Sequence, residues 1–95
     1  MFPYWEIVVF EEKLIKNNFE VELLPEVLVF LDGLQEKARA KIYYNIRKSQ
    51  MVTDEELFKK LNENIWEFRT LFAGKTYPLF SFWDPHRKSF FIGTH

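Results

Sequence analysis

The stretch IWEFRTLFAGKTYPLFSFWDPHRKSFFIGT, residues 65–94, decides the fold of this chain. Aromatic and β-branched residues gather in three runs within it, which we expect to be strands: residues 65–73, 77–84 and 89–94. Gly74-Lys75 predicts a tight turn after the first run, and Asp84-Pro85-His86 predicts a turn after the second. Three consecutive strands with such short connections predict an antiparallel meander.

The segment LFKKLNENIWEFR, Leu57–Arg69, leads into this meander. Thr53-Asp54-Glu55-Glu56 is a capping-box pattern and predicts a short helix that ends near Leu61. A turn is expected at residues 62–64, where two asparagines flank a glutamate. The segment brings two lysines and an arginine beside one sheet, where such cations could contact an RNA phosphate.

Residues 25–48 predict two helices joined by a short break. Pro25 suits the first turn of the first helix, and Gly33 falls near its end. The apolar residues of the first helix recur at helical spacing: Val27, Leu28, Phe30, Leu31 and Leu34. Those of the second helix, Gln35–Lys48, lie along one face: Ala38, Ile42 and Ile46. We expect a helical hairpin that packs on the sheet.

The N-terminal residues predict further elements. Residues 19–24 alternate apolar and acidic side chains, which predicts a half-buried strand with Phe19, Val21 and Leu23 on one face. Tyr4–Phe10 reads as a strand, and Glu11–Asn17 as a short helix. The expected fold class is therefore α+β: a helical hairpin packed on a curved antiparallel sheet, with an extra N-terminal segment.

Composition limits the class of protein. The chain has 95 residues, so we expect a single domain over residues 1–95. Apolar residues make up 47% and aromatic residues 19%, which predicts a real hydrophobic core. The chain has no cysteine, which excludes a disulfide framework and a thiolate metal site. No signal peptide and no apolar run of membrane-spanning length is recognisable, so we expect a cytoplasmic protein without membrane contact.

Charge and histidine placement limit the kind of site. The net charge is −1, so RNA binding would depend on local clusters of lysine and arginine. His86 and His95 have no companion carboxylate at ligand spacing, so neither a metal site nor a cofactor is expected. No glycine-rich phosphate loop is present either.

The order of these elements and their residues resembles the RelE/ParE toxin superfamily, in particular its phage-derived, HigB-like branch. The segments that carry the resemblance run from Phe19 to His95: FEVELLPEVLVFLDGL, EKARAKIYYNI, ELFKKL, IWEFRTL, LFSFWD and FFIGTH. The resemblance implies a RelE-like fold and a toxin of a type II toxin–antitoxin system. It further implies an endoribonuclease that cleaves ribosome-bound mRNA without a metal, and a partner antitoxin with a helix-turn-helix domain.

The same resemblance implies roles for individual residues. Arg69 matches the family's arginine on the strand after the Trp-Glu pair, and its guanidinium would hold a phosphate during in-line attack by a ribose 2′-OH. Lys59 and Lys60 match the basic pair before that strand and would contact the RNA backbone. His95 matches the histidine that ends the last strand and would transfer a proton. Tyr77 opens the next strand, and we expect it to line the catalytic face beside Arg69.

Departures from the family pattern bear on activity. The family usually has an arginine after the tyrosine of its YRLFxF strand, whereas this chain has Pro78, which predicts a bulge or a sheet edge there. The family continues past the histidine with a glycine, a lysine pair and a helix, whereas this sequence stops at His95, so we expect a C-terminally truncated toxin. Residues 1–18 exceed what the family has before its first strand, and their role stays open.

Plainer interpretations stand beside these roles. Arg69 can be a solvated strand residue paired with Glu67 or another carboxylate. Adjacent lysines on a helix point in different directions, so at most one of Lys59 and Lys60 faces the site. As the last residue, His95 can be an idle terminus. The aromatic residues of the meander can stack on bases, but core packing is the better interpretation, with at most one or two exposed: Trp66, Phe68, Phe80, Phe82 and Trp83.

Two other functions remain open at this point. The chain can be an inactive or truncated toxin homologue that only binds its antitoxin or forms a homodimer, which Pro78 and the missing tail favour. It can also be a gyrase inhibitor like the ParE branch, although the WEFR and KKL matches argue against that interpretation.

Overall fold

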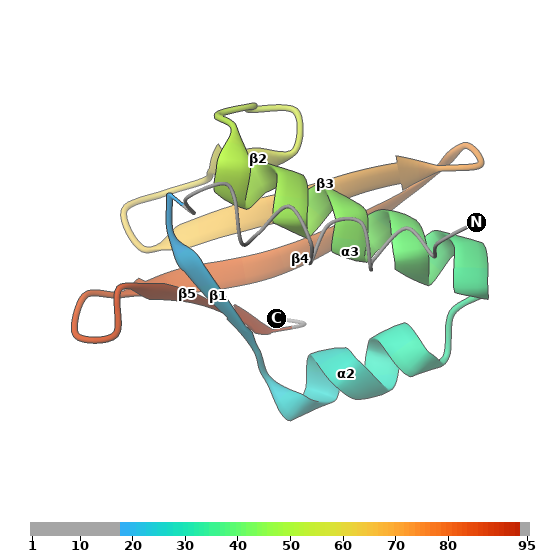
Figure 1. Cartoon of the computed structure of the whole chain (residues 1–95), viewed down its shortest axis with the longest axis horizontal. Coiled ribbons are helices and arrows are strands. Elements are labelled where there is room, and N and C mark those ends of the chain that lie inside the picture. Colours follow the sequence, from blue (N-terminus) through green and yellow to red (C-terminus); the bar gives the residue numbers. More distant parts are fainter. Residues whose placement is uncertain (1–17, 94–95) are drawn as a thin grey trace.

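The computed structural model of the protein describes residues 18–93, which form two helices and one five-stranded sheet (Figure 1). The elements follow in this order: β1 (Glu20–Leu23), α2 (Pro25–Asp32), α3 (Glu36–Met51), β2 (Phe58–Lys60), β3 (Ile65–Phe72), β4 (Lys75–Asp84) and β5 (Ser89–Gly93). The predicted α+β class, with a helical hairpin on a sheet, is confirmed. The strand predicted over Tyr4–Phe10 and the helix predicted over Glu11–Asn17 lie outside the described residues.

The sheet has the strand order β1-β5-β4-β3-β2. β3, β4 and β5 form the predicted antiparallel meander, with Phe68 opposite Leu79 and Phe82 opposite Phe91. β1, however, lies parallel to β5 at one edge of the sheet. The sheet is therefore mixed rather than purely antiparallel, because the chain crosses over through α2 and α3 between β1 and the other strands.

The β3–β4 hairpin turns one residue earlier than the sequence indicated. Phe72 is opposite Lys75, so the turn residues are Ala73 and Gly74 rather than Gly74 and Lys75. Both turn residues have positive φ angles, 52° for Ala73 and 76° for Gly74. A two-residue loop with two positive φ angles is the type I′ geometry that suits the twist of antiparallel strands.

Asparagine and aspartate side chains close the other turns of the sheet. Asn62 Oδ1 accepts hydrogen bonds from the backbone N–H groups of Asn64 and Ile65, each at 2.9 Å. After β4, Asp84 Oδ1 accepts a hydrogen bond from the His86 backbone N–H at 2.9 Å. Short polar side chains that accept from the backbone two or three residues ahead stabilise turns. The turns predicted before β3 and after β4 are confirmed.

The first helix of the hairpin, α2, begins and ends where the sequence indicated. Pro25 lies in the first turn, and Gly33 is the C-terminal cap, with its N–H directed at the last carbonyl groups. Val27 and Leu31, one helical turn apart, are completely buried. Leu28 and Phe30 are exposed, so α2 buries a narrower stripe than its apolar spacing predicts.

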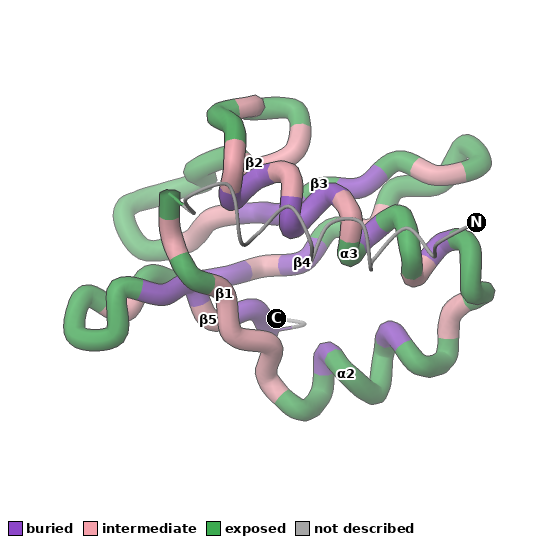
Figure 2. The backbone as a smooth tube through the Cα atoms, viewed as in Figure 1, coloured by how far each residue is buried: buried purple, intermediate pink, exposed green. Residues whose placement is uncertain are grey.

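The second helix, α3, lies across the sheet and packs on β3 (Figure 1). Ala38, Ile42 and Ile46 are buried on one face, as predicted, and buried positions recur between exposed ones along the helix (Figure 2). Asn45 lies on the same side, and its Nδ2 donates a hydrogen bond to Thr70 Oγ1 of β3 at 3.2 Å. Both residues are buried, so loss of either would leave its partner unsatisfied, and the bond fixes α3 against β3.

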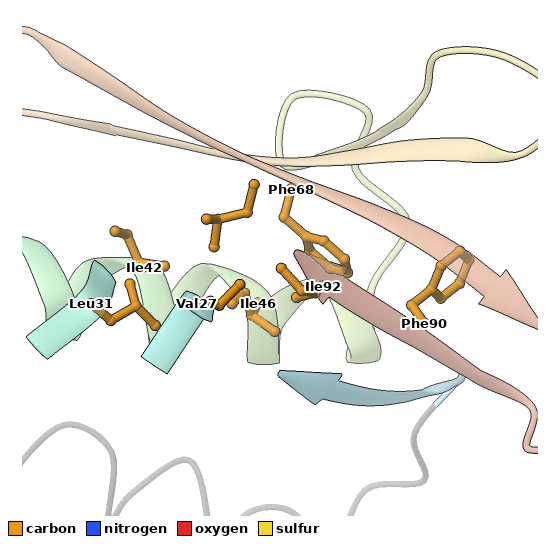
Figure 3. Packing of buried hydrophobic residues seen from close by; sticks show 8 residues of the cluster. Val27, Leu31, Ile42, Ile46, Phe68, Phe90 and Ile92 are labelled. Carbon is orange, nitrogen blue, oxygen red and sulfur yellow. The ribbon is translucent and has the colours of Figure 1, made fainter. Parts of the chain in front are cut away.

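One hydrophobic core lies between the two helices and the sheet (Figure 3). Its buried members come from both helices and three strands: Val27, Leu31, Ile42, Ile46, Phe68, Leu79, Phe90 and Ile92. Phe19, Val21 and Leu23 pack against this core, as the alternation of residues 19–24 predicted. Full burial of one such side chain contributes about 1.5–3 kcal/mol to the free energy of unfolding, so the core stabilises the fold more than any turn does.

The prediction of a short helix from Thr53 to about Leu61 is wrong. Leu57 and Phe58 do donate their backbone N–H groups to the Asp54 carbonyl, at 3.0 and 2.9 Å, so a single helical turn forms. The chain then extends into β2, where Phe58 is opposite Phe68 and their ring centroids lie 4.3 Å apart. Tertiary packing of the Phe58 ring outweighs the local capping signal, because helix propensity is a weak preference.

Neither helix in residues 18–93 is long and apolar enough to cross a membrane.

We expect the Ala73→Gly substitution to stabilise the protein by about 0.5–1 kcal/mol, because alanine is strained at a positive φ and glycine is not. The matched control is Ala40→Gly, the same chemical change at an exposed position of α3, which should destabilise by about 1 kcal/mol. Urea unfolding of both variants measures the two changes. Equal destabilisation by both substitutions would contradict the turn assignment.

Candidate functional site

Side chains of β3 alternate between the two faces of the sheet. Phe68 belongs to the core and Thr70 bonds to α3, so these two residues face the helices. Glu67 and Arg69 alternate with them and lie on the opposite face, which neither described helix covers (Figure 1). We call this side the open face; the strand registers assign to it Lys59, Ile65, Glu67, Arg69, Leu71, Pro78, Phe80, Phe82, Phe91 and Glu22.

Arg69 is half-exposed and is held by Glu67. Glu67 Oε1 accepts from Arg69 Nε at 2.8 Å and lies 2.7 Å from Arg69 Nη2. The Arg69 side chain is 48% exposed, whereas that of Glu67 is 10% exposed. Glu67 occupies only the Nε–Nη2 edge of the guanidinium, so the Nη1–Nη2 edge is left for a second anion such as a phosphate. The pairing considered from the sequence is therefore present, and it orients the cation without burying it.

Lys59 and Lys60 lie on β2 rather than on a helix. Lys59 is exposed and directly opposite Glu67, so it lies on the open face. Lys60 is opposite Trp66 on the other side of the strand, and its Nζ lies 5.9 Å from the Trp66 ring centroid. Only one of the two lysines thus shares a face with Arg69, as predicted, although the reason is strand alternation rather than helical geometry. Lys59, Glu67 and Arg69 form what we call the open-face cluster.

Pro78 lies directly opposite Arg69 on the open face. The resemblance described above implies an arginine at this position, and that arginine would be the nearest cross-strand neighbour of Arg69. The β3–β4 register runs through this pair without a bulge. Arg69 donates its backbone N–H to the carbonyl of Leu57, the residue before β2, at 2.8 Å. The Arg69–Pro78 pair therefore exchanges no ladder hydrogen bonds, and the proline fits.

The expectation that Tyr77 shares a face with Arg69 is wrong. Tyr77 is opposite Thr70, whose side chain is bonded to Asn45 of α3, and it packs against the hydrophobic core. Lys75 Nζ lies 5.5 Å from the Tyr77 ring centroid. Tyr77 and Arg69 therefore lie on opposite sides of the sheet, because the residue opposite Arg69 is its neighbour Pro78. A direct catalytic contact by Tyr77 at the open-face cluster does not fit this geometry.

The remaining candidates concern proton transfer and metal binding. His95 lies outside the described residues, so its role stays a prediction. Within residues 18–93, no group of three or more histidine, aspartate or glutamate side chains is placed to hold a metal ion. The described cations of the open-face cluster, Lys59 and Arg69, are the groups there that could neutralise a phosphate.

Aromatic residues of the meander lie on both faces of the sheet, and some of them are exposed. Phe68 is buried, while Phe82 and Trp83 are exposed, as the sequence predicted for one or two of these rings. Phe82 stacks on Phe91, with ring centroids 5.6 Å apart and planes at 15°. The open face therefore has an aromatic centre, and the open-face cluster lies toward one of its edges.

Sequence reasoning missed the strand character of residues 58–60, which is what places Lys59 beside Glu67. A signal was present: an aromatic residue and two lysines precede the Asn62–Asn64 turn, and a strand follows it, so a hairpin across that turn was available. The capping-box pattern at residues 53–56 favours a helix instead and so competes with the hairpin signal.

The fold and the open-face cluster together define a small α+β protein with exposed cations on a sheet face. Its sequence matches the family described as "Phage derived protein Gp49-like (DUF891)" over residues 29–92, which is more than half of the chain. The chain belongs to this phage-derived Gp49-like family, which is related to toxins of the RelE type. Comparisons with curated proteins and with solved structures gave no match.

If the open-face cluster contacts RNA, the Lys59→Ala substitution should weaken binding of single-stranded RNA and flatten its salt dependence. Loss of one phosphate contact lowers the slope of log K against log salt by about 0.7 for single strands. Lys75→Ala removes the same charge from the tip of the β3–β4 hairpin and serves as the control. Fluorescence anisotropy of a labelled oligonucleotide over a salt series measures both slopes. Identical slopes for the two variants would remove Lys59 from the interface.

Proposed function

We propose that this protein is the toxin of a phage-derived type II toxin–antitoxin pair, of the HigB-like kind, and that it cleaves mRNA at the open-face cluster. The single observation that carries the proposal is the position of two exposed cations, Lys59 and Arg69, on neighbouring strands of a sheet face that neither described helix covers. Family membership supports the same conclusion at a coarser level.

The open-face cluster suits the demands of RNA cleavage by the 2′-OH. The 2′-oxygen forms a bond to phosphorus while the bond to the 5′-oxygen breaks, and negative charge grows on the phosphate oxygens. The Nη1–Nη2 edge of Arg69 would bind those oxygens, and Glu67 would keep the guanidinium in position without reorganisation. Lys59 would hold the phosphate backbone beside it. One proton leaves the 2′-OH and one reaches the 5′-oxygen, and His95 is the proposed group for such a transfer.

A ribosome is the proposed platform that presents the mRNA. The chain carries 13 lysine and arginine residues against 14 acidic residues, so its bulk charge attracts RNA only weakly. Glu67 also offsets part of the charge of the open-face cluster. A cytoplasmic ribosome that holds mRNA extended would supply the positioning that the protein's own electrostatics do not provide.

The proposed inhibitor is an antitoxin that carries a helix-turn-helix domain and lays an apolar and acidic segment across the open face. Phe82 and Leu71 expose 45% and 63% of their surface there and offer apolar contacts. Acidic side chains of the segment would pair with Lys59 and Arg69 and exclude a phosphate from them. Such binding would silence the toxin by occupying its substrate face.

Induced expression of the full-length gene tests the proposal. We expect growth arrest with loss of mRNA from the wild type, and Arg69→Ala should lower cleavage by a factor of about 100 to 1,000, as for loss of one preorganised charge-stabilising donor. Arg87→Ala is the matched control, because Arg87 is also an exposed arginine on the meander that pairs with a glutamate, Glu22. It should leave the arrest unchanged. Arrest that survives in Arg69→Ala would remove Arg69 from the mechanism.

The second candidate function is an inactive toxin homologue that binds its antitoxin or forms a dimer. Two observations favour it: Glu67 offsets the charge of Arg69, and Pro78 occupies the position where a further arginine is usual. A cluster with one compensated arginine stabilises a pentavalent phosphate less than a cluster with two arginines would. Absence of arrest and of RNA cleavage in the wild type, with antitoxin binding retained, would select this function. A gyrase inhibitor would instead arrest growth with mRNA intact.

The Pro78→Arg substitution separates a weakened active site from an unrelated surface. An arginine there would face the same phosphate as Arg69, and we expect cleavage to rise by a factor of about 10 to 100. Pro78→Ala restores the backbone N–H without adding charge and should leave the rate near that of the wild type. Cleavage of a defined RNA by the purified variants measures both. A rate for Pro78→Arg no higher than for Pro78→Ala would argue against phosphate binding at this position.

A further inference from the structure

A cavity of about 550 Å³ lies on the helix-covered side of the sheet, beside β2 and the C-terminal end of α3. Four aromatic residues form its apolar wall: Phe19, Phe58, Trp66 and Phe90. Phe58 and Trp66 are stacked, with ring centroids 4.7 Å apart and planes at 15°. Phe90 meets the Phe58 ring edge-on at 4.9 Å. The cavity therefore has a preformed aromatic wall and a size within the range of small-ligand sites.

Charged residues of both signs line this cavity, and they come from different segments. Lys59 and Lys60 come from β2, and Lys60 Nζ lies 5.9 Å from the Trp66 ring centroid. Asp54 and Glu55 come from the turn that precedes β2. Asp54 Oδ1 is bonded to the Glu56 backbone N–H at 2.9 Å, which fixes the carboxylate in place. A ligand with an anionic end and a neutral ring that carries N–H groups matches this polarity.

We propose that this cavity binds one unpaired nucleobase of the RNA substrate, with the adjoining phosphate held by the lysines of β2. The proposal rests on the proposed function in that the ligand is RNA. Bases of every kind stack on aromatic side chains, and unpaired RNA is commonly recognised in this way. The carboxylates of Asp54 and Glu55 would accept hydrogen bonds from the base edge and repel the phosphate, so a nucleotide would enter base first.

The position of β2 connects this cavity to the open-face cluster. Lys60 faces the cavity side of the strand and Lys59 faces the open face, and both line the cavity. β2 is an edge strand among the described strands, so an RNA backbone could pass over it from one side of the sheet to the other. The strand neighbouring β2 carries Arg69. The base in the cavity would thus fix which phosphate reaches Arg69.

Binding of mononucleotides to the full chain tests the cavity without any cleavage. The probes are 5′-AMP and 5′-CMP, with ribose 5-phosphate as a probe that has the anion but no base. Backbone amide shifts in NMR titrations should map the two nucleotides to residues that line the cavity: Asn18, Ser49, Thr53 and Lys60. Ribose 5-phosphate should leave Asn18 and Ser49 unshifted. Identical shifts from ribose 5-phosphate and the nucleotides would reveal an anion site only and overturn the proposal.

A variant that fills the cavity mouth gives a second test. Thr53 lines the cavity and is exposed, so Thr53→Trp should weaken 5′-AMP binding by about tenfold or more without removing a core side chain. Val29→Trp, at a position of α2 that is 74% exposed and does not line the cavity, is the control and should bind as the wild type does. Unchanged binding in Thr53→Trp, or equal loss in both variants, would overturn the proposal.

The outcomes separate this proposal from the proposed function. Arg69→Ala should lower cleavage by the factor of about 100 to 1,000 given above. It should leave 5′-AMP binding intact, because Arg69 does not line the cavity. Cleavage that depends on Arg69 in a protein that binds no mononucleotide would overturn the base pocket and leave the ribonuclease standing. Binding of 5′-AMP in the cavity of a protein that cleaves no RNA would overturn the ribonuclease and leave the base pocket standing.

Discussion

The alternation of side chains along β3 is the constraint on which the rest of the structure depends. Phe68 is buried in the core and Thr70 is hydrogen-bonded to Asn45 of α3, so the register of β3 is fixed from inside. Glu67 and Arg69 must then lie on the open face. A slip by one residue would place a guanidinium in the core and a phenylalanine outside, at a large cost in free energy. Core packing thus determines where the cation is presented.

The sequence predicted those elements whose signals are local. The helices are indicated by the helical spacing of their apolar residues, and the first helix also by Pro25 and Gly33. The meander is indicated by its runs of aromatic and β-branched residues and by Asn62 and Asp84 in its turns. Three features depend on tertiary contacts and could not be read in the same way. β1 pairs with β5 in the parallel direction, and its partner comes from the far end of the sequence. β2 is a strand because the Phe58 ring packs on Phe68. Tyr77 lies on the helix-covered face because it pairs with Thr70.

The candidate site was predictable residue by residue only in part. Arg69 and Lys59 do share a face, and the pairing of Arg69 with a carboxylate could be considered from the sequence. That Glu67 contacts only the Nε–Nη2 edge, and so orients the arginine without burying it, depends on side-chain geometry. The aromatic wall of the cavity likewise cannot be predicted from the sequence, because its residues come from four separate segments: Phe19, Phe58, Trp66 and Phe90. The residues that meet at such a site depend on the pairing register of the strands, and packing of the hydrophobic core fixes that register.

The two lysines of β2 also discourage edge-to-edge aggregation of the protein. A strand at the edge of a sheet presents unpaired backbone groups to which another chain can add, and natural proteins discourage such addition with short, charged edge strands. β2 is an edge strand among the strands that the structure describes, and two of its three residues are lysines. Like charges would therefore meet if two such edges approached each other. The same ammonium groups would therefore serve solubility as well as recognition. Selection against aggregation alone could retain lysine here even in a descendant that no longer touches nucleic acid.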